Sequence, residues 1–435
     1  MKKIAIVFAL LISFVGTSFA KNPFAHRFFE VRVDVPVEVS NNLVSLKEVM
    51  QESVVIDLSE IAEKVAFKGA AIKAFAAPTF SLNLDIPHGL ILGLSVGVEG
   101  DASVGLSKDL FEFLGNGNVG MGDDFVVQTS NTYADIFATA TVKGGWNFKK
   151  SKIEFEGTAF STLAHFDASQ TSARVFMKDN KVGVQANLEA KGYSNCDLAN
   201  ISDVQGILSS IGDGIGFDVG AKYQRELFKF LTVGAQARIP IVPSRLNTGY
   251  NVTYTYDKYL GFDEFVGMGG DDGDDGSSSE VPQYQEGEDD EDLTGLAAIL
   301  GKPIKLETPY AIHRPLKFGI SADFHPFGTL LSTTGYVGVG FRHPFASAIN
   351  KDNGGRDETQ FYFDYSIGGR LSLWNILSFS LSHSYMDEVF KNQFTVELNI
   401  RLLEVDAGVS FQSTNFAQSF TGAGVGAFVT LCVGF

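Results

Sequence analysis

Strict alternation of apolar and polar side chains constrains this chain more than any other feature. In residues 29–39, F-E-V-R-V-D-V-P-V-E-V, every odd position is Phe or Val and every even position is charged or is Pro36. A period of two places these two kinds of side chain on opposite faces of a β-strand. The pattern recurs at 361–373, 377–385, 394–402, 405–411 and 427–435. It therefore predicts an all-β fold.

Alternation and turn residues together predict sixteen strands. Residues 171–178 and 181–192 could instead form one hairpin outside the main sheet, which would leave fourteen strands. Residues 248–261 also alternate, and we expect them in a loop extension because Pro240 and Pro243 interrupt the preceding run. The expected strands are 27–39, 70–86, 90–104, 129–147, 152–166, 171–178, 181–192, 214–226, 229–242, 307–325, 330–342, 359–373, 375–388, 391–402, 404–412 and 421–435.

Short connections alternate with long ones along the chain. Residues 374–375 and 403–404 are short joins, whereas 105–128, 194–213, 262–305 and 343–358 are long. This pattern is typical of an up-and-down antiparallel sheet with short turns at one end and long loops at the other. The alternating runs, such as residues 361–373, are long enough for the ~9–11 residues that cross a bilayer at a tilt. We therefore expect a transmembrane antiparallel β-barrel of about 14–16 strands, with short helical pieces in a plug and in the loops.

The apolar faces are suited to lipid. Those of 361–373, 377–382, 394–402 and 427–435 contain no Asp, Glu, Lys or Arg, and a charged side chain on a lipid face costs ~2–4 kcal/mol near the midplane. His383 is the titratable exception, near a strand end. Trp374, Tyr385 and Phe435 also fall at strand ends, as an aromatic girdle requires.

Both ends of the chain carry export features. Residues 1–20 combine two lysines, an apolar run at 4–15 and the small residues of Ser18-Phe19-Ala20, which is the pattern of a signal peptide. The chain ends on Phe435, with Leu431 and Val433 on the same face. This ending looks like the signal that the barrel assembly machinery reads on the last strand. We therefore expect residues 21–435 to lie in the outer membrane, with its lipid and that machinery as partners.

Amphipathic helical segments fall in the connections. A helical insert is expected at 44–68, where Ser45 and Glu48 form a capping box, and a helical loop at 194–213. A further apolar stripe covers 293–300. These segments either pack over the barrel mouth and plug it, or line a pocket for an apolar ligand. On the second interpretation the candidate lining residues are Ile201, Val204, Leu208, Leu296 and Leu300.

Two arginines on inward faces are candidates to bind the carboxylate of a ligand. Arg370 and Arg401 lie on the polar faces of their strands. The alternative is that they form ion pairs inside the lumen with Asp364 and Glu397.

One segment is strongly acidic. Residues 262–292 hold thirteen acidic residues and no Lys or Arg, so the segment repels itself and is expected to be a solvated, disordered loop. The alternative is a weak divalent-cation site outside the cell.

No catalytic pattern is present. The seven His residues form no H-x-x-x-H motif, and no P-loop, G-x-S-x-G or dinucleotide fingerprint has a suitable context. The formal net charge of −17 argues against nucleic-acid binding. We expect no enzyme activity, no cofactor and no metal.

These features together resemble a known family. The segments H-R-F-F-E-V-R-V-D-V-P-V-E-V-S-N-N at 26–42 and H-R-P-L-K-F-G-I-S-A-D-F-H-P-F-G at 313–328, with the signal peptide and Phe435, resemble spirochaetal outer-membrane barrels. Those proteins are grouped with the long-chain fatty-acid transporter (FadL-type) family. The resemblance implies about fourteen strands, an N-terminal plug and helical outer loops around an apolar ligand site.

The first functional hypothesis is an outer-membrane transporter or channel for small hydrophobic molecules such as long-chain fatty acids. One alternative is a surface-exposed structural or adhesive barrel, whose loops contact host or other extracellular molecules. Another is a general diffusion porin.

Overall fold

The structure, a computed structural model, describes residues 27–43, 65, 69–86, 89–116, 124–129, 132–168, 171–178, 181–195, 212, 214–261, 304–306, 309–342, 344, 360–374, 376–400 and 402–435. The predicted signal peptide and acidic loop therefore lie outside the described residues. So do the helical segment 293–300, the insert 44–68 apart from Val65, and most of 194–213.

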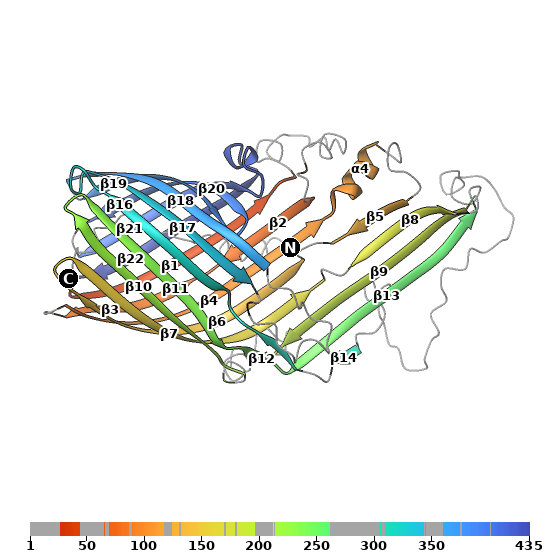
Figure 1. The fold of residues 1–435 in the computed structure, drawn as a ribbon, viewed down its shortest axis with the longest axis horizontal. Coiled ribbons are helices and arrows are strands. Elements are labelled where there is room, and N and C mark those ends of the chain that lie inside the picture. Colours follow the sequence, from red (N-terminus) through yellow and green to blue (C-terminus); the bar gives the residue numbers. More distant parts are fainter. Residues whose placement is uncertain are drawn as a thin grey trace.

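Fourteen antiparallel strands close into a barrel (Figure 1). Fourteen is one of the two strand numbers predicted from the sequence. β2 and β3 count as one strand because both lie between β1 and β4. The barrel closes where β1 pairs with β22, from Glu30↔Gly434 to Val39↔Val425. In order around the barrel the strands are β1 (Phe29–Asn41), β2 (Ala70–Ala76) with β3 (Thr79–Ile86), β4 (Leu90–Leu106), β6 (Tyr133–Asn147), β7 (Ser151–Asp167), β10 (Gly216–Phe228), β11 (Leu231–Val242), β16 (Leu316–Phe324), β17 (Leu331–Arg342), β18 (Gln360–Leu373), β19 (Leu377–Met386), β20 (Val389–Asn399), β21 (Leu403–Ser413) and β22 (Gly424–Gly434).

A second group of strands projects beyond one end of the barrel (Figure 1). Its order is β5 (Asp124–Gln128), β8 (Ser172–Lys178), β9 (Lys181–Ser194), β13 (Thr248–Gly261) and β14 (Ile304–Leu306). We call these strands the extension. β9 joins the extension to the barrel by pairing with the end of β7. The hairpin outside the barrel and the loop extension at 248–261 are thus confirmed. β5 was not predicted, because it lies in a stretch that was expected to be a long connection.

Pro36 fits into β1 because the neighbouring strand is interrupted beside it. β3 pairs with β1 up to Asp34, and β2 pairs with it from Val37. Proline has no N–H to donate, and the Pro36 carbonyl accepts a hydrogen bond of 3.2 Å from the Ala77 N–H. The expected single strand 70–86 is therefore wrong in one respect, since it breaks at Ala77 and Pro78.

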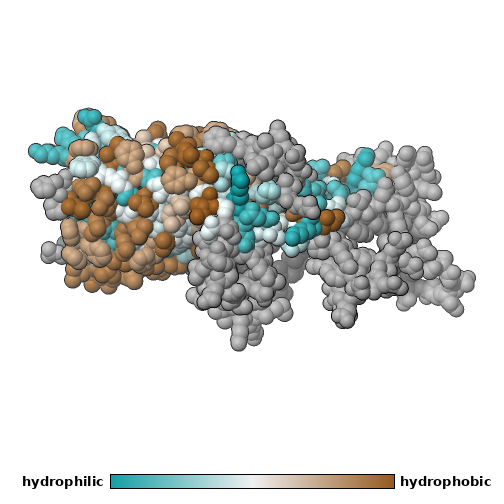
Figure 2. Space-filling model, turned by 90° about the horizontal axis from the view of Figure 1, so that it is seen from below, coloured by the Kyte–Doolittle hydropathy of each residue, from teal (hydrophilic) through white to brown (hydrophobic). Residues whose placement is uncertain are grey.

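The outer wall of the barrel is apolar and the inner wall is mostly polar. Leu381, Ile320 and Val142 are among the outward side chains and are each about two-thirds exposed. Inward positions carry buried polar groups, such as Asp364 and Glu404. Figure 2 shows the resulting brown surface over the barrel wall and more teal toward the extension. A closed sheet with this polarity is a membrane-spanning barrel, because an apolar outer wall is suited to lipid and every described barrel strand is paired on both sides.

Aromatic side chains gather at both ends of the barrel wall. At the end with short turns, Trp374 and Phe435 are exposed, and the Phe435 ring contacts Phe28 and Phe29. At the other end His383 lies on the outer face beside aromatic rings and takes part in hydrogen bonds with Tyr365 and Asn392. The rings around His383 are Tyr365, Phe390, Phe416 and Phe420. Two such belts are the pattern expected at the two membrane interfaces.

The described helices are short. α4 (Lys108–Asn116) begins directly after Ser107, and η2 (Gln418–Phe420) is a single turn. No helix among the described residues is long and apolar enough to cross a membrane.

Leu381→Arg should lower the free energy of unfolding by about 2–4 kcal/mol, because it places a charge on the lipid face. Urea titration of the protein folded into lipid vesicles measures this change. Leu381→Phe is the matched control and should change stability little, since it stays apolar. An equal and small effect of both substitutions would contradict the assignment of this face to lipid.

Candidate binding site at the barrel mouth

A two-stranded ribbon, which we call the clip, lies at the mouth of the barrel. Its strands are β12 (Ser244–Leu246) and β15 (Tyr310–Ile312), which pair only with each other. The expected strand 307–325 is therefore wrong as a single strand. It divides at residues 313–315, where Pro315 cannot donate to a ladder, into β15 in the clip and β16 in the barrel wall.

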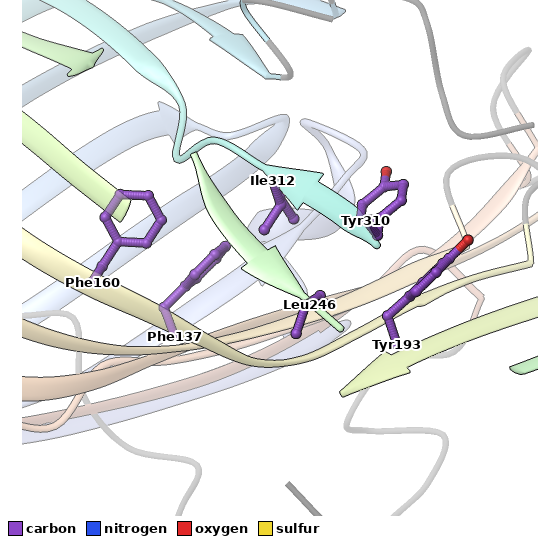
Figure 3. Close-up of a cluster of buried hydrophobic side chains, with 6 residues drawn as sticks. All are labelled: Phe137, Phe160, Tyr193, Leu246, Tyr310 and Ile312. Atoms are coloured by element: carbon purple, nitrogen blue, oxygen red, sulfur yellow. The ribbon is translucent and has the colours of Figure 1, made fainter. Parts of the chain in front are cut away.

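The clip buries an apolar cluster against the inner wall (Figure 3). Phe137 of β6 and Phe160 of β7 point inward and meet edge to face, with ring centroids 5.9 Å apart. Leu246 and Ile312 of the clip pack against them, and Leu246 has no exposed surface. The whole group, which we call the mouth cluster, is Phe137, Phe160, Tyr193, Leu246, Tyr310 and Ile312. It is an apolar patch inside a mostly polar lumen.

Two hydrogen bonds fix the clip to the wall. The Thr162 N–H donates to Ser244 Oγ at 2.9 Å. The Arg245 N–H donates to the Gly214 carbonyl at 2.8 Å. Gly214 has a φ of 69°, and a Cβ there would lie 2.1 Å from the Arg245 carbonyl oxygen. Glycine is therefore required where the clip approaches the start of β10.

Arg314 anchors the segment that follows the clip. Its Nη1 donates to Asp218 Oδ2 at 2.8 Å, and its Nη2 donates to Glu99. These carboxylates belong to β10 and β4, so one guanidinium ties two separate parts of the wall together. Burial alone would lower the pKa of Arg314, but Glu99 and Asp218 raise it above its ordinary value. The arginine therefore stays charged in this buried position.

A second charged group crosses the lumen near the clip. The turn of Asp387 and Glu388 has positive φ values of 51° and 66°, the backbone of a two-residue hairpin turn. Lys73 of β2 donates to Glu388 at 3.2 Å, and Arg342 of β17 pairs with Asp387. Arg342 also lies over the ring of Tyr133, on β6, at 5.7 Å. Burial alone would raise the pKa of Asp387, but Arg342 and Lys73 lower it well below its ordinary value.

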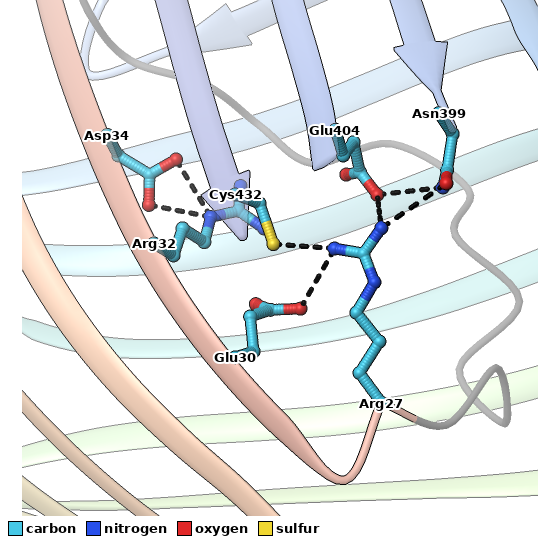
Figure 4. Close-up of polar contacts among 7 residues, drawn as sticks. All are labelled: Arg27, Glu30, Arg32, Asp34, Asn399, Glu404 and Cys432. Carbon is cyan, nitrogen blue, oxygen red and sulfur yellow. Dashed lines mark hydrogen bonds and ion pairs between the residues drawn. The ribbon is translucent and has the colours of Figure 1, made fainter. Parts of the chain in front are cut away.

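The other end of the lumen is also held by ion pairs (Figure 4). Arg27, just before β1, donates to Glu404 at 3.0 Å and to Cys432 Sγ at 2.6 Å. Arg32 pairs with Asp34 at 2.7 Å on β1. Charged side chains therefore link strands at both ends of the interior.

The chain is a membrane β-barrel with the clip packed against the inner wall at its mouth. No family model matches it, and no curated protein does. Solved structures match over nearly its whole length at low identity. A mutant of the TodX monoaromatic hydrocarbon channel is 10% identical, with a TM-score of 0.49 and 97% of each chain covered. The P. putida toluene transporter TodX is 10% identical, with a TM-score of 0.44, covering 98% of this chain and 94% of that one.

A Pseudomonas aeruginosa FadL homologue is 11% identical to this chain, with a TM-score of 0.43, and the match covers 94% of this chain and 91% of that one. The assignment as a barrel rests on its strand pairing. The spirochaetal part of the resemblance stays a prediction.

The sequence-predicted site residues have different outcomes. Arg370 donates to Glu397 at 2.7 Å and to Ser378 at 3.0 Å, which is one of the ion pairs expected as the alternative to a ligand contact. Asp364 instead accepts a hydrogen bond from the Asp387 N–H at 2.9 Å. The remaining candidates, Ile201, Val204, Leu208, Leu296, Leu300 and Arg401, lie outside the described residues. Their role as ligand contacts stays a prediction.

The expected assembly signal lies on the outer face of β22. Leu431, Val433 and Phe435 are all exposed there. Their recognition by the assembly machinery stays a prediction.

One group of described carboxylates is close enough to hold a metal ion. Glu397, Glu404 and Asp406 place ligand atoms within 4.8 Å of one another. Arg370 contacts Glu397 and Arg27 contacts Glu404. We therefore interpret the group as part of the lumen ion-pair network.

The mouth cluster was not found from the sequence. Phe137 and Phe160 are apolar residues at inward positions of their strands, which is a detectable departure from the alternation. Tyr310 and Leu246 lie in short stretches without periodicity, so no sequence pattern could have placed them together.

Proposed function

We propose that this protein is an outer-membrane transporter for small hydrophobic molecules, which enter the barrel through the mouth closed by the clip. The observation that carries the proposal is the mouth cluster. Water-filled channels have polar walls, whereas ligand sites for apolar molecules are concave and lined mainly by apolar and aromatic side chains. An apolar patch in a polar lumen is therefore suited to an apolar cargo.

The ion pairs around the clip favour a gated path over a permanently open pore. Lys73 links β2 to the turn between β19 and β20, Arg342 links β17 to the same turn, and Arg314 contacts both β10 and β4. A general diffusion porin would leave a water-filled passage along its axis. We propose that the clip moves aside when a ligand enters the mouth.

The finer parts of the proposal concern the ligand and the route of export. We propose long-chain fatty acids as one ligand class, with Arg401 and the predicted helical loops contributing to the site. Residues 1–20 would direct export, and the assembly machinery would insert the barrel. We propose a role in transport and not in catalysis.

The extension favours a second function. Its strands project beyond the barrel (Figure 1), which places a sheet and the connections around it outside the membrane. A surface platform for extracellular contacts would use this part and would leave the mouth cluster without a role.

Uptake into liposomes distinguishes the two functions. Purified protein in vesicles should accelerate the entry of a fluorescent fatty acid and of toluene over protein-free vesicles, while sucrose entry stays at the background rate. The apolar mouth admits the first two solutes, and the charged lumen crossings hinder bulk passage of the third. Entry of all three solutes at the background rate would contradict the transporter. Rapid entry of sucrose would indicate a porin.

A further inference from the structure

We infer that His165 and Tyr193 form a stacking platform for a planar phenolic ring, and that Tyr310 of the clip occupies this platform in the present structure. This inference rests on the proposed function and deepens it by naming a ligand class and the residues that receive it.

The platform consists of two rings on neighbouring strands. His165 of β7 and Tyr193 of β9 are register partners, with ring centroids 6.1 Å apart. The Tyr310 ring lies across both, 4.5 Å from His165 at 9° and 4.7 Å from Tyr193 at 25°. Offset stacking at such separations is favourable for aromatic rings. The platform is therefore shaped for a planar ring, and a puckered group of equal volume would stack less well.

The two platform rings are held independently of Tyr310. His165 Nδ1 lies 2.5 Å from Asp135 Oδ1, on the register partner in β6. The Tyr193 ring lies against Gly249 of β13, where an added Cβ would come within 2.5 Å of the ring. Tyr310 belongs to the clip, which pairs with neither β7 nor β9. The β12 strand of the clip is tied to the end of β9, because Asn195 Nδ2 donates to the Arg245 carbonyl at 2.7 Å and Asn195 Oδ1 accepts from the Asn247 N–H at 2.9 Å. The other strand, β15, can therefore carry Tyr310 away and leave the platform in place.

A polar group on the platform points to the chemistry of the ligand. Tyr193 is 2% exposed, and its hydroxyl makes no hydrogen bond with any residue in the described part of the chain. A buried hydroxyl without a partner destabilises the site, because it has lost its hydrogen bonds to water. The tethered Tyr310 ring stacks on Tyr193 but leaves this hydroxyl without a partner. A free phenolic ring can turn on the platform and bring its hydroxyl to Tyr193 Oη, which a plain hydrocarbon cannot do.

Tyr310 is itself a phenol, and p-cresol is its side chain as a free molecule. Ligand binding on the platform would therefore compete directly with closure of the clip by Tyr310. On this account a phenolic ligand is both cargo and the trigger that opens the mouth.

Thiol labelling tests the competition. Ile312→Cys is introduced with Cys196→Ser and Cys432→Ser, and the folded protein in detergent is treated with a water-soluble maleimide. Ile312 is buried, so labelling without ligand should be slow. p-Cresol should accelerate labelling by displacing Tyr310 and releasing the clip. 4-Methylcyclohexanol, of similar size but not planar, should leave the rate unchanged.

Two variants distinguish ligand binding at the platform from a general loosening of the mouth. A change in electrophoretic migration on heating checks that each variant is folded. With Tyr193→Leu the acceleration by p-cresol should be lost. With Tyr193→Phe, which keeps the ring, acceleration should return but require more p-cresol. The inference is overturned if p-cresol has no effect on the intact platform, or if 4-methylcyclohexanol accelerates labelling equally.

Failure of this inference is distinguishable from failure of the proposed function. Uptake of hydrophobic solutes by a protein that does not respond to p-cresol would overturn the platform alone. Acceleration of labelling by p-cresol without uptake of any solute would leave the platform standing and overturn the transporter.

Discussion

Arg314→Leu should lower the free energy of unfolding by about 3–5 kcal/mol, the usual effect of removing one partner from a buried ion pair. Asp218 is almost fully buried and Glu99 is partly buried, and both carboxylates contact this guanidinium. Without Arg314 both charges would stay in the lumen and lose their hydrogen bonds. Equilibrium unfolding in urea, in the same lipid vesicles as the unaltered protein, measures the loss.

A charge-balanced variant controls for lost packing. Arg314→Leu combined with Glu99→Gln and Asp218→Asn removes all three charges, so that no uncompensated charge is left in the lumen. The triple variant should therefore be more stable than Arg314→Leu alone. If both variants lost the same stability, the destabilisation would come from side-chain packing and the electrostatic interpretation of this anchor would be wrong.

The barrel could be predicted from the sequence because lipid and lumen impose opposite demands on neighbouring residues. Strands such as β1, β18 and β22 alternate along their full length, since one face meets lipid and the other meets the lumen. Their bounds therefore agree with the predicted ones to within a few residues. β2 and β3 were joined in the prediction because Ala77 and Pro78 break the strand without disturbing the alternation on either side.

The mouth could not be predicted because its contacts are not periodic. β12 and β15 have three residues each, too few to show alternation, and they pair across more than sixty residues of chain. Arg314 meets Glu99 and Asp218 only after the barrel has closed. Arg370 was correctly placed on an inward face, because the two-residue alternation shows which face of a strand a side chain lies on. Its pairing with Glu397 was only one of two stated alternatives, because the alternation does not show which partner it meets.

A locked clip should block transport. The contact of 2.9 Å between Ser244 Oγ and the Thr162 N–H brings the two backbones close enough for a disulfide, which needs Cα atoms roughly 4.4–6.8 Å apart. Thr162→Cys with Ser244→Cys, in a chain carrying Cys196→Ser and Cys432→Ser, would bind the clip covalently to β7. If ligands pass through the mouth, the clip must move, and the disulfide prevents this movement.

The matched control is the same chain with only Ser244→Cys, which cannot form the bond. Oxidation should leave uptake by this control unchanged, so any difference between the two proteins reports the lock itself. Mass spectrometry before and after reduction confirms that the disulfide has formed.

The central claim is that hydrophobic molecules enter through a mouth that the clip closes, and fatty-acid uptake by vesicles carrying the locked protein tests it most directly. We expect uptake at the protein-free background rate in the oxidised state, and uptake equal to that of the single-cysteine control after reduction. Equal uptake by the oxidised and reduced proteins would show that ligands do not pass the clip, and would contradict the claim.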